Sequence, residues 1–217
     1  MASGESREYD VRADRGFFAK DPARLARDLL GMVLVRVLED GERLAGLVVE
    51  TEAYGGAEDL GSHARGGRRT PRNESMYAAP GTAYVYFTYG MHHCMNLVGG
   101  KVDVPCAALI RAIEPCEGID RMRLLRGTAS GGRPRPVTDL GSGPGKLCRA
   151  LSIDRALDGT DMVTSGVLYL EYPARRQRGR VRRTARIGLG DAGAWTHKPL
   201  RWFLSGNPHV SRGRPSG

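Results

Sequence analysis

The stretch 32-MVLVRVLEDGERLAGLVVETEAY-54 decides the fold, because two apolar runs flank one turn within it. Residues 32–38 have the length and composition of a β-strand, and Asp40 and Gly41 are the residues that a two-residue hairpin turn prefers. Residues 44–54 then return as the partner strand. The sequence therefore predicts a β-hairpin whose second strand ends in two glutamates and a tyrosine.

The chain on both sides of this hairpin alternates between helix and strand patterns. A helix is expected at 21–30, where Asp21 is a suitable N-cap, Pro22 follows in the first turn and Gly31 can end the helix. Further strands are expected at 83–89, 94–99, 106–115 and 167–172, and further helices at 118–127 and 146–153. This order predicts an α+β protein with a single domain, in which a mixed, antiparallel-rich curved β-sheet is flanked by helices.

The boundaries of this domain follow from the composition of the two ends. We expect the domain at residues 17–212, between a flexible N-terminal tail at 1–16 and a short C-terminal tail at 213–217. The first residues are polar and lack the apolar core of a signal peptide, and no run approaches the roughly 18–20 apolar residues of a membrane helix. A cytoplasmic protein is therefore expected, and we expect it to be a monomer.

The charge of the chain indicates the kind of partner. The 217 residues include 33 lysines and arginines against 24 aspartates and glutamates, a formal net charge of +9. An excess of this size favours a polyanionic partner, either nucleic acid or an anionic membrane. A membrane-surface protein would need a basic amphipathic helix, which the sequence does not show. Nucleic acid is therefore the expected partner.

Two glutamates at the end of the hairpin are candidates for chemistry. Glu50 and Glu52 are two residues apart and so share one strand face, which Tyr54 continues. Because residues 47–49 are apolar and look buried, Glu52 lies where a core strand emerges. A carboxylate held there, partly away from water, is a candidate general base. The competing interpretation is an ordinary exposed glutamate that one of the many arginines stabilises.

A second informative stretch is 84-YVYFTYGMHHCMN-96, which holds three tyrosines in a chain that is only 6% aromatic. Tyr84 and Tyr86 share one face of the expected strand, and Tyr89 directly precedes a glycine where the strand turns. Tyr84 alone is equally well explained as a half-buried core residue with a solvated hydroxyl. In a basic protein, a projecting Tyr89 fits a wedge that fills the place of a displaced nucleotide, and Tyr54 and Tyr86 fit the walls of a base pocket.

Seven motifs occur in a specific order along the chain. They are ETEAYGG (50–56), HARGGRRTPRN (63–73), YVYFTYGM (84–91), CMN (94–96), ALIRAIEP (108–115), GSGPGKLC (141–148) and ARIGLG (185–190). In this order and spacing they closely resemble the 3-methyladenine DNA glycosylases of the alkyladenine (methylpurine) type, over residues 20–212. Each motif alone is weak, whereas the ordered set is highly specific.

The resemblance implies an activity. It implies a monofunctional DNA glycosylase that flips alkylated or deaminated purines, of the 3-methyladenine, 7-methylguanine, hypoxanthine and ethenoadenine type, out of duplex DNA. A glutamate-activated water would then hydrolyse the N-glycosidic bond, which starts base excision repair. The implied partner is double-stranded DNA containing damaged purines.

The resemblance also implies roles for single residues. Glu52 would be the general base, and Arg111 and the backbone carbonyl of Ile187 would help to hold the attacking water. Asn96 would disfavour normal guanine by a clash with its 2-amino group. The residues implied to surround the base are Tyr54, His63, Tyr86 and Asn96. Those implied to enter or contact the DNA are Tyr89, as the intercalating side chain, and Met91, Thr70, Arg72, Met76 and Lys146.

Three features depart from the family pattern. His92 stands beside the expected wedge where relatives carry an aromatic residue, and Gly145 stands where a hydroxyl side chain can occur. The segment 175–186 is unusually rich in arginine, which fits either an additional phosphate clamp or, as we favour, a solvated loop.

Two alternative functions remain open at this point. The first is a catalytically silent nucleic-acid-binding module, against which the presence of Glu52 and Arg111 argues. The second is a metal-dependent nuclease that would use the nearby carboxylates Glu50, Glu52, Glu58 and Asp59. We expect neither a metal nor another cofactor. No lysine lies in the segments around Glu52 and Tyr86 to form a Schiff base, which favours a water-dependent enzyme that leaves the strand intact.

Overall fold

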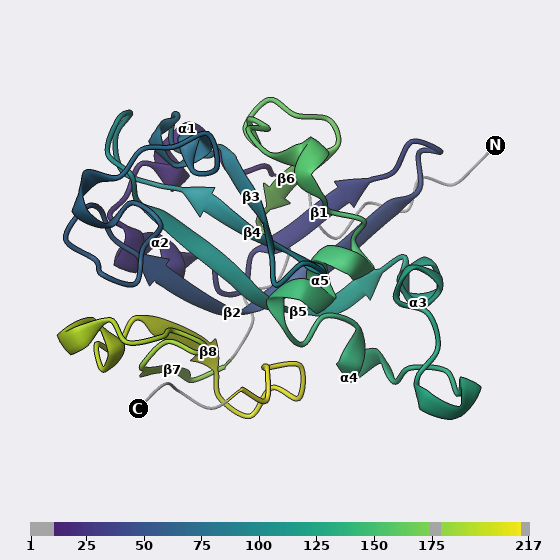
Figure 1. Ribbon diagram of the computed structural model, residues 1–217. Coiled ribbons are helices and arrows are strands. Elements are labelled where there is room, and N and C mark those ends of the chain that lie inside the picture. Colours follow the sequence, from purple (N-terminus) through teal and green to yellow (C-terminus); the bar gives the residue numbers. More distant parts are fainter. Residues whose placement is uncertain (1–10, 174–178, 214–217) are drawn as a thin grey trace.

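The computed structural model describes residues 11–173 and 179–213, and its centre is one eight-stranded sheet (Figure 1). The strands are β1 (Val33–Val37), β2 (Arg43–Tyr54), β3 (Ala83–Thr88), β4 (His92–Val98), β5 (Ala107–Glu117), β6 (Leu168–Glu171), β7 (Val181–Thr184) and β8 (Arg201–Leu204). Neighbours follow the order β3-β4-β5-β2-β1-β6, and β8 pairs with both β2 and β7. The α+β class is confirmed, and every pairing among the described strands is antiparallel.

Strand β2 changes its partner half-way along, and this change places the two glutamates. The expected hairpin forms, with Gly41 in the left-handed region at the turn (φ 82°). Beyond the β1 pairing, the same edge of β2 pairs with β8, where Glu50 lies opposite Phe203 and Glu52 opposite Arg201. The register against β5 shifts on both sides of Glu50. Such irregularities bend a strand and redirect its side chains, and they are common next to active sites.

The two faces of β2 at this point have different neighbours. Thr51 alternates with the glutamates, so its side chain leaves the strand on the opposite face. Its hydroxyl donates to the carbonyl of Ala26 at 2.6 Å, which ties β2 to helix α2 (Pro22–Asp28). Because α2 covers that face, Glu50 and Glu52 project from the face that carries the site.

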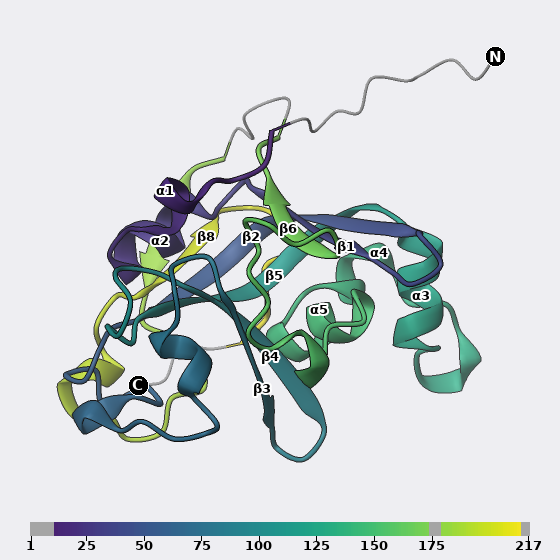
Figure 2. The ribbon, with the colours of Figure 1, turned by 90° about the horizontal axis from the view of Figure 1, so that it is seen from above.

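The α-helices lie in two groups, with α1 (Arg15–Phe18) and α2 on one side of the molecule and α3 (Ile119–Arg126), α4 (Val137–Leu140) and α5 (Pro144–Ala150) on the other (Figure 2). The short 3₁₀ helices are η1 (Arg65–Gly67), η2 (Glu74–Tyr77), η3 (Ser130–Gly132), η4 (Arg155–Leu157) and η5 (Gly193–Thr196). The expected helices at 21–30, 118–127 and 146–153 are confirmed as α2, α3 and α5. None of the helices in the described ranges is long and apolar enough to cross a bilayer.

One large core cluster fixes the sheet against both groups of helices. It includes Leu25 of α2, Val48 of β2, Ile110 of β5 and Leu147 of α5, none of which is exposed. Burying a side chain of this size stabilises the fold by roughly 1.5–3 kcal/mol. The strands that carry the glutamates and Arg111 are therefore held by packing against this core.

Residues 11–16, which were expected to belong to a tail, are part of the fold. Within the range expected as a tail, Arg12 forms a β-bridge with Glu171, and the N–H of Ala13 donates to the carbonyl of Leu170 at 3.0 Å. Residues 1–10 lie outside the described residues, as do 214–217, which belong to the expected C-terminal tail.

The arginine-rich segment at 175–186 is not a solvated loop throughout. Residues 174–178 lie outside the described residues, but Val181–Thr184 form β7 and pair with β8. Arg186, at the end of the segment, has no exposed surface. The interpretation as a solvated loop is therefore wrong for residues 181–186, because pairing with β8 draws this part of the chain into the fold.

Candidate active site

A cavity of about 420 Å³ opens beside the ends of β2 and β3 and the loop that follows β7. Its volume is typical of small-ligand pockets, which span roughly 300–1,000 Å³. The residues that sequence reasoning placed at the site and that line the cavity are Tyr54, His63, Met76, Tyr86, Tyr89, Asn96, Arg111 and Ile187. Tyr84, Cys94 and Leu109 line it as well.

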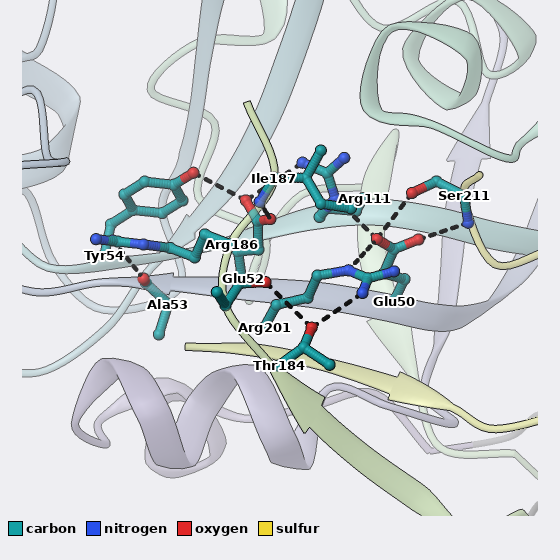
Figure 3. Close-up of polar contacts among 11 residues, drawn as sticks. Glu50, Glu52, Ala53, Tyr54, Arg111, Thr184, Arg186, Ile187, Arg201 and Ser211 are labelled. Atoms are coloured by element: carbon teal, nitrogen blue, oxygen red, sulfur yellow. Dashed lines mark hydrogen bonds and ion pairs between the residues drawn. The ribbon is translucent and has the colours of Figure 1, made fainter. Parts of the chain in front are cut away.

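Glu52 lies directly behind the wall of this cavity and has no exposed surface (Figure 3). Its Oε1 accepts a hydrogen bond from the N–H of Ile187 at 2.7 Å, and its Oε2 accepts one from the Tyr54 hydroxyl at 2.8 Å. Arg111 Nη1 lies 3.2 Å from the same Oε2. Burial raises the pKa of Glu52 above its ordinary value, while these three donors favour the ionised form and limit the rise. The carboxylate is therefore a better proton acceptor than an exposed glutamate.

Glu50 is equally buried, but its oxygens are fully used (Figure 3). Its Oε1 accepts from Arg111 Nε at 2.9 Å, from Arg201 Nε at 2.7 Å and from the Ser211 hydroxyl at 2.9 Å. Its Oε2 accepts from the Ser211 N–H at 2.7 Å. Because a carboxylate has about four acceptor positions, Glu50 is saturated, whereas Glu52 keeps capacity for one more donor.

Tyr54 joins the cavity wall to the carboxylate. Its ring lines the cavity while its hydroxyl donates to Glu52. Burial, followed by the charge of Glu52, raises the pKa of Tyr54 well above the ordinary value for tyrosine. The phenol therefore keeps its proton and remains a donor to the carboxylate at any physiological pH.

His63 and two tyrosines form a ring cluster on another wall of the cavity. His63 Nδ1 lies 2.7 Å from the Tyr84 hydroxyl, and the ring centroids of His63 and Tyr86 are 4.6 Å apart. Burial, with further contributions from Arg72 and Arg65, lowers the pKa of His63. A neutral imidazole whose Nδ1 accepts from Tyr84 presents its Nε2–H as a donor. Tyr84 is thus buried, at 1% exposed, and also part of the cavity wall.

Asn96 closes one side of the cavity from the neighbouring strand. It lies opposite Tyr84 in the β3–β4 ladder and is 3% exposed. Its Nδ2 donates to the carbonyl of Tyr84 at 3.2 Å. The amide is therefore held in a fixed orientation at the cavity surface.

The β3–β4 hairpin projects from the sheet (Figure 2), and its tip carries two large, exposed side chains. Tyr89 is 80% exposed and Met91 69% exposed, which is unusual for side chains of this size. The backbone of Tyr89 has a φ of 50°, a conformation that costs a non-glycine residue roughly 1 kcal/mol or more. The turn thus holds an aromatic ring outward at the rim of the cavity.

The other residues expected to contact DNA lie in different surroundings. Arg72 donates to the carbonyl of Phe87 at 2.9 Å, and its guanidinium carbon lies 5.3 Å from the centre of the Tyr86 ring, so the cation is near the cavity. Met76 is 2% exposed and belongs to the cavity wall rather than to the outer surface. The N–H and the hydroxyl of Thr70 both donate hydrogen bonds to the side chain of Asn73, so the donors of Thr70 already have a partner within the protein.

Lys146 does not join the cavity. Its ammonium group pairs with Asp139, which also accepts from Arg135. The contact of this α5 end with the cavity comes from Pro144, two residues earlier.

Comparison with known proteins identifies the family to which this site belongs. A family model described as methylpurine-DNA glycosylase matches residues 16–208, which is most of the chain. The chain belongs to the methylpurine-DNA glycosylase family. A Mus musculus protein named DNA-3-methyladenine glycosylase is 46% identical over 209 residues, which cover 94% of this chain and 62% of that protein.

Two further relatives show how the lengths compare. A Homo sapiens protein with the same name is 47% identical over 199 residues, 90% of this chain and 66% of that protein. The chain therefore spans less than two thirds of the length of these mammalian relatives. A Natranaerobius thermophilus protein named putative 3-methyladenine DNA glycosylase is 41% identical over 201 residues, 93% of this chain and 99% of that protein.

His92 and Gly145, the two single positions where the sequence suggested a departure, lie in contact with each other. A Cβ added to Gly145 would stand 2.9 Å from Cγ and 3.0 Å from Cβ of His92. Real Cβ atoms essentially never approach another atom within 3.0 Å. The glycine therefore makes room for the imidazole, and the two positions have to be considered as a pair.

Sequence reasoning missed several residues of the candidate site. Arg201 and Ser211 bind Glu50, and Arg186 binds Asp59, across long separations in sequence. Only Arg186 carried a signal, because it directly precedes Ile187 in the last motif.

The carboxylates proposed for a metal-dependent nuclease are not gathered into a metal site. Glu50 is held by two arginines, and Asp59 forms an ion pair with Arg186. Within residues 11–173 and 179–213, no group of three or more histidine, cysteine, aspartate or glutamate side chains is arranged to hold a metal ion.

Proposed function

We propose that the chain is a monofunctional DNA glycosylase that removes alkylated or deaminated purines from duplex DNA. The observation that carries the proposal is the environment of Glu52, a buried carboxylate of raised pKa directly behind the wall of a tyrosine-lined cavity. Membership of the methylpurine-DNA glycosylase family supports it. We further propose that the protein acts as a monomer in the cytoplasm.

The reaction assigns one step to the carboxylate. A water attacks C1′ of the flipped nucleotide, Glu52 accepts its proton, and the electrons of the C1′–N bond leave with the purine. The sugar gains oxocarbenium character in the transition state, so an adjacent anion also lowers the barrier electrostatically. In this proposal Arg111 and the carbonyl of Ile187 hold the water, and an abasic site remains in an uncut strand.

The cavity accounts for the choice of base. Alkylation at N3 or N7 makes a purine cationic and a good leaving group. Tyr54 and Tyr86 present aromatic faces to the cavity, and cation–π attraction to such a ring is worth about 0.5–2 kcal/mol. In the proposal the Nε2–H of His63 meets an acceptor on the edge of the base, and Asn96 disfavours normal guanine.

The hairpin tip accounts for access to the duplex. In the proposal Tyr89 enters the base stack and fills the space of the flipped nucleotide, with Met91 beside it. Unstacking costs a few kcal/mol, which contacts to the displaced base offset. The net charge of +9 attracts the phosphate backbone.

The burial of Glu52 adds one requirement to the proposal. Because the carboxylate has no exposed surface, water reaches it only if the side chain of Tyr54 or the segment 187–190 shifts when the base enters. Tyr54 and Ile187 line the cavity and also bind Glu52, so they belong to the part of the wall that separates the carboxylate from the cavity.

The decisive experiment is base release from DNA of known composition. Purified protein is incubated with duplexes that each contain one 7-methylguanine, 3-methyladenine, hypoxanthine or ethenoadenine, with EDTA present, and the free base is measured directly. We expect release of free base, with strand breaks only after alkali treatment, and no release by the Glu52→Gln variant. Binding without release from any of the four duplexes would instead identify a catalytically silent module.

A further inference from the structure

A fully buried ion pair lies behind Tyr54 and has no part in the chemical step. Arg186 Nη1 and Nη2 donate to the two carboxylate oxygens of Asp59 at 2.6 Å and 2.8 Å, and neither side chain is exposed. A buried pair of this kind is often no more stabilising than apolar residues of the same volume. Stability alone is therefore a weak explanation for its presence next to the cavity.

The pair connects the segments that carry the site. Arg186 Nη1 also donates to the carbonyl of Ala53 at 3.0 Å, which fixes the end of β2 (Figure 3). Asp59 accepts from the N–H of Gly55 at 3.0 Å and of Gly61 at 2.9 Å, which shapes the loop that leads to His63. Arg186 is also the direct neighbour of Ile187, whose N–H binds Glu52.

The guanidinium of Arg186 is stacked against Tyr54 (Figure 3). Its central carbon lies 4.6 Å from the centre of the Tyr54 ring. Tyr54 lines the cavity, whereas Arg186 is fully buried and does not. The ring therefore separates the guanidinium from any base in the cavity, and Asp59 neutralises the charge behind the ring.

We propose that Arg186 and Asp59 are positioning residues that hold Tyr54 against Glu52 and, as a neutral pair, keep the Tyr54 face attractive to cationic purines. This inference rests on the proposed function and adds that the pair controls the preference for cationic over neutral purines. A base stacked roughly 3.5 Å beyond the ring lies about 8 Å from the guanidinium. At an effective dielectric constant near 20, an uncompensated charge at that distance disfavours a cationic base by a factor on the order of 10 to 30.

The test compares a cationic with a neutral lesion under single-turnover conditions. The ratio of kcat/KM for 7-methylguanine to that for hypoxanthine is measured for the wild type and each variant. Asp59→Asn leaves a positive charge behind Tyr54, and we expect the ratio to fall about 10-fold or more. Arg186→Lys keeps the charge but loses the two-pronged contact, so both lesions should be released more slowly at an unchanged ratio. The double variant Asp59→Asn with Arg186→Gln is neutral again, and its ratio should return to within about threefold of the wild type.

A matched control separates this effect from general destabilisation. Arg43 and Glu171 form another largely buried ion pair, which does not line the cavity. Glu171→Gln should lower the thermal midpoint while the lesion ratio stays unchanged. If Asp59→Asn slows the release of both bases by the same factor, so that the ratio stays unchanged as in the control variant, the proposal is overturned.

The outcomes remain decisive if one variant does not fold. Should Asp59→Asn be unfolded, Arg186→Gln and Arg186→Lys are compared, because the first removes the positive charge and the second keeps it. A higher ratio for Arg186→Gln than for Arg186→Lys supports the proposal, and equal ratios overturn it. A wild type that releases neither base would reject the proposed function itself, which is a different result from an altered ratio in an active enzyme.

Discussion

Replacing Glu52 by glutamine should remove base release and leave the fold intact. The amide oxygen of a glutamine can still accept from the N–H of Ile187, which lies 2.7 Å from the present Oε1. Arg111 keeps its second anionic partner, because its Nε donates to Glu50 at 2.9 Å. The amide NH₂ then stands in the place of Oε2, where the Tyr54 hydroxyl can turn to accept from it, while Arg111 Nη1 loses its acceptor at this position.

The expected size of the effect follows from the role of the carboxylate. A positioned general base contributes roughly 10²- to 10⁴-fold to a rate, and the electrostatic support of the oxocarbenium ion is lost as well. We expect single-turnover release of 7-methylguanine to fall by at least about 10³-fold. Because burial raises the pKa of Glu52, the ionised form is disfavoured by folding, and the loss of this charge should offset part of the cost of the lost Arg111 contact in the free energy of unfolding at pH 7.

Glu50→Gln is the matched control on the same strand. Glu50 is as buried as Glu52 but serves as the common partner of Arg111 and Arg201. Breaking a buried ion pair by removing one partner costs about 3–5 kcal/mol, so this variant should lose stability in urea unfolding. The reasoning is refuted if Glu52→Gln releases base as fast as the wild type, or if the two variants have the same stability.

Three further predictions concern pH, the tip of the β3–β4 hairpin, and the contact between Gly145 of α5 and His92 of β4. Since burial raises the pKa of Glu52, base release should decline as pH falls through a value above the ordinary pKa of about 4.3. Over the same range the contribution of Glu52 to the free energy of unfolding should rise, because the folded state binds the proton more tightly than the unfolded state. A pH–rate profile checks the first trend, and urea unfolding at each pH checks the second. Tyr89→Ser should weaken binding of a lesion in duplex DNA more than in single-stranded DNA, because only the duplex needs a wedge; equal losses in a fluorescence titration would contradict that role. Gly145→Ser should cost about 1–3 kcal/mol of stability through overlap with His92. His92→Ala removes Cγ and Nδ1 but keeps the Cβ, so it should relieve part of that cost in a double-mutant cycle.

The parts of the fold that the sequence predicted depend on local signals. Asp40 and Gly41 specify their turn through backbone preferences of adjacent residues, and Asp21 caps its helix by accepting from the N–H groups of Ala23 and Arg24. The same holds for Tyr89, whose position beside a glycine predicted an exposed ring. In each case the residues that decide the structure are neighbours in the chain.

The parts that could not be predicted depend on contacts between distant segments. Arg201 and Ser211, which donate hydrogen bonds to the carboxylate oxygens of Glu50, are more than 150 residues away from it in the sequence. The burial of Arg186 requires β7 to pair with β8 and Asp59 to lie below Tyr54. Arginine is usually exposed. The arginine-rich composition of residues 175–186 therefore favoured a solvated loop, because the sequence did not show that β8 and Asp59 are its partners.

The contacts of Ser211 with Glu50 have a consequence for synthesis of the protein on the ribosome. Strand β2 leaves the exit tunnel early, whereas two of the donors that compensate Glu50, Arg201 and Ser211, are translated more than 150 residues later. At bacterial-type rates of about 5–20 residues per second, the strand waits on the order of 10 seconds or more with Arg111 as the only one of these three partners of Glu50 already translated. Nascent chains arrested before Ser211 should therefore remain open at this position.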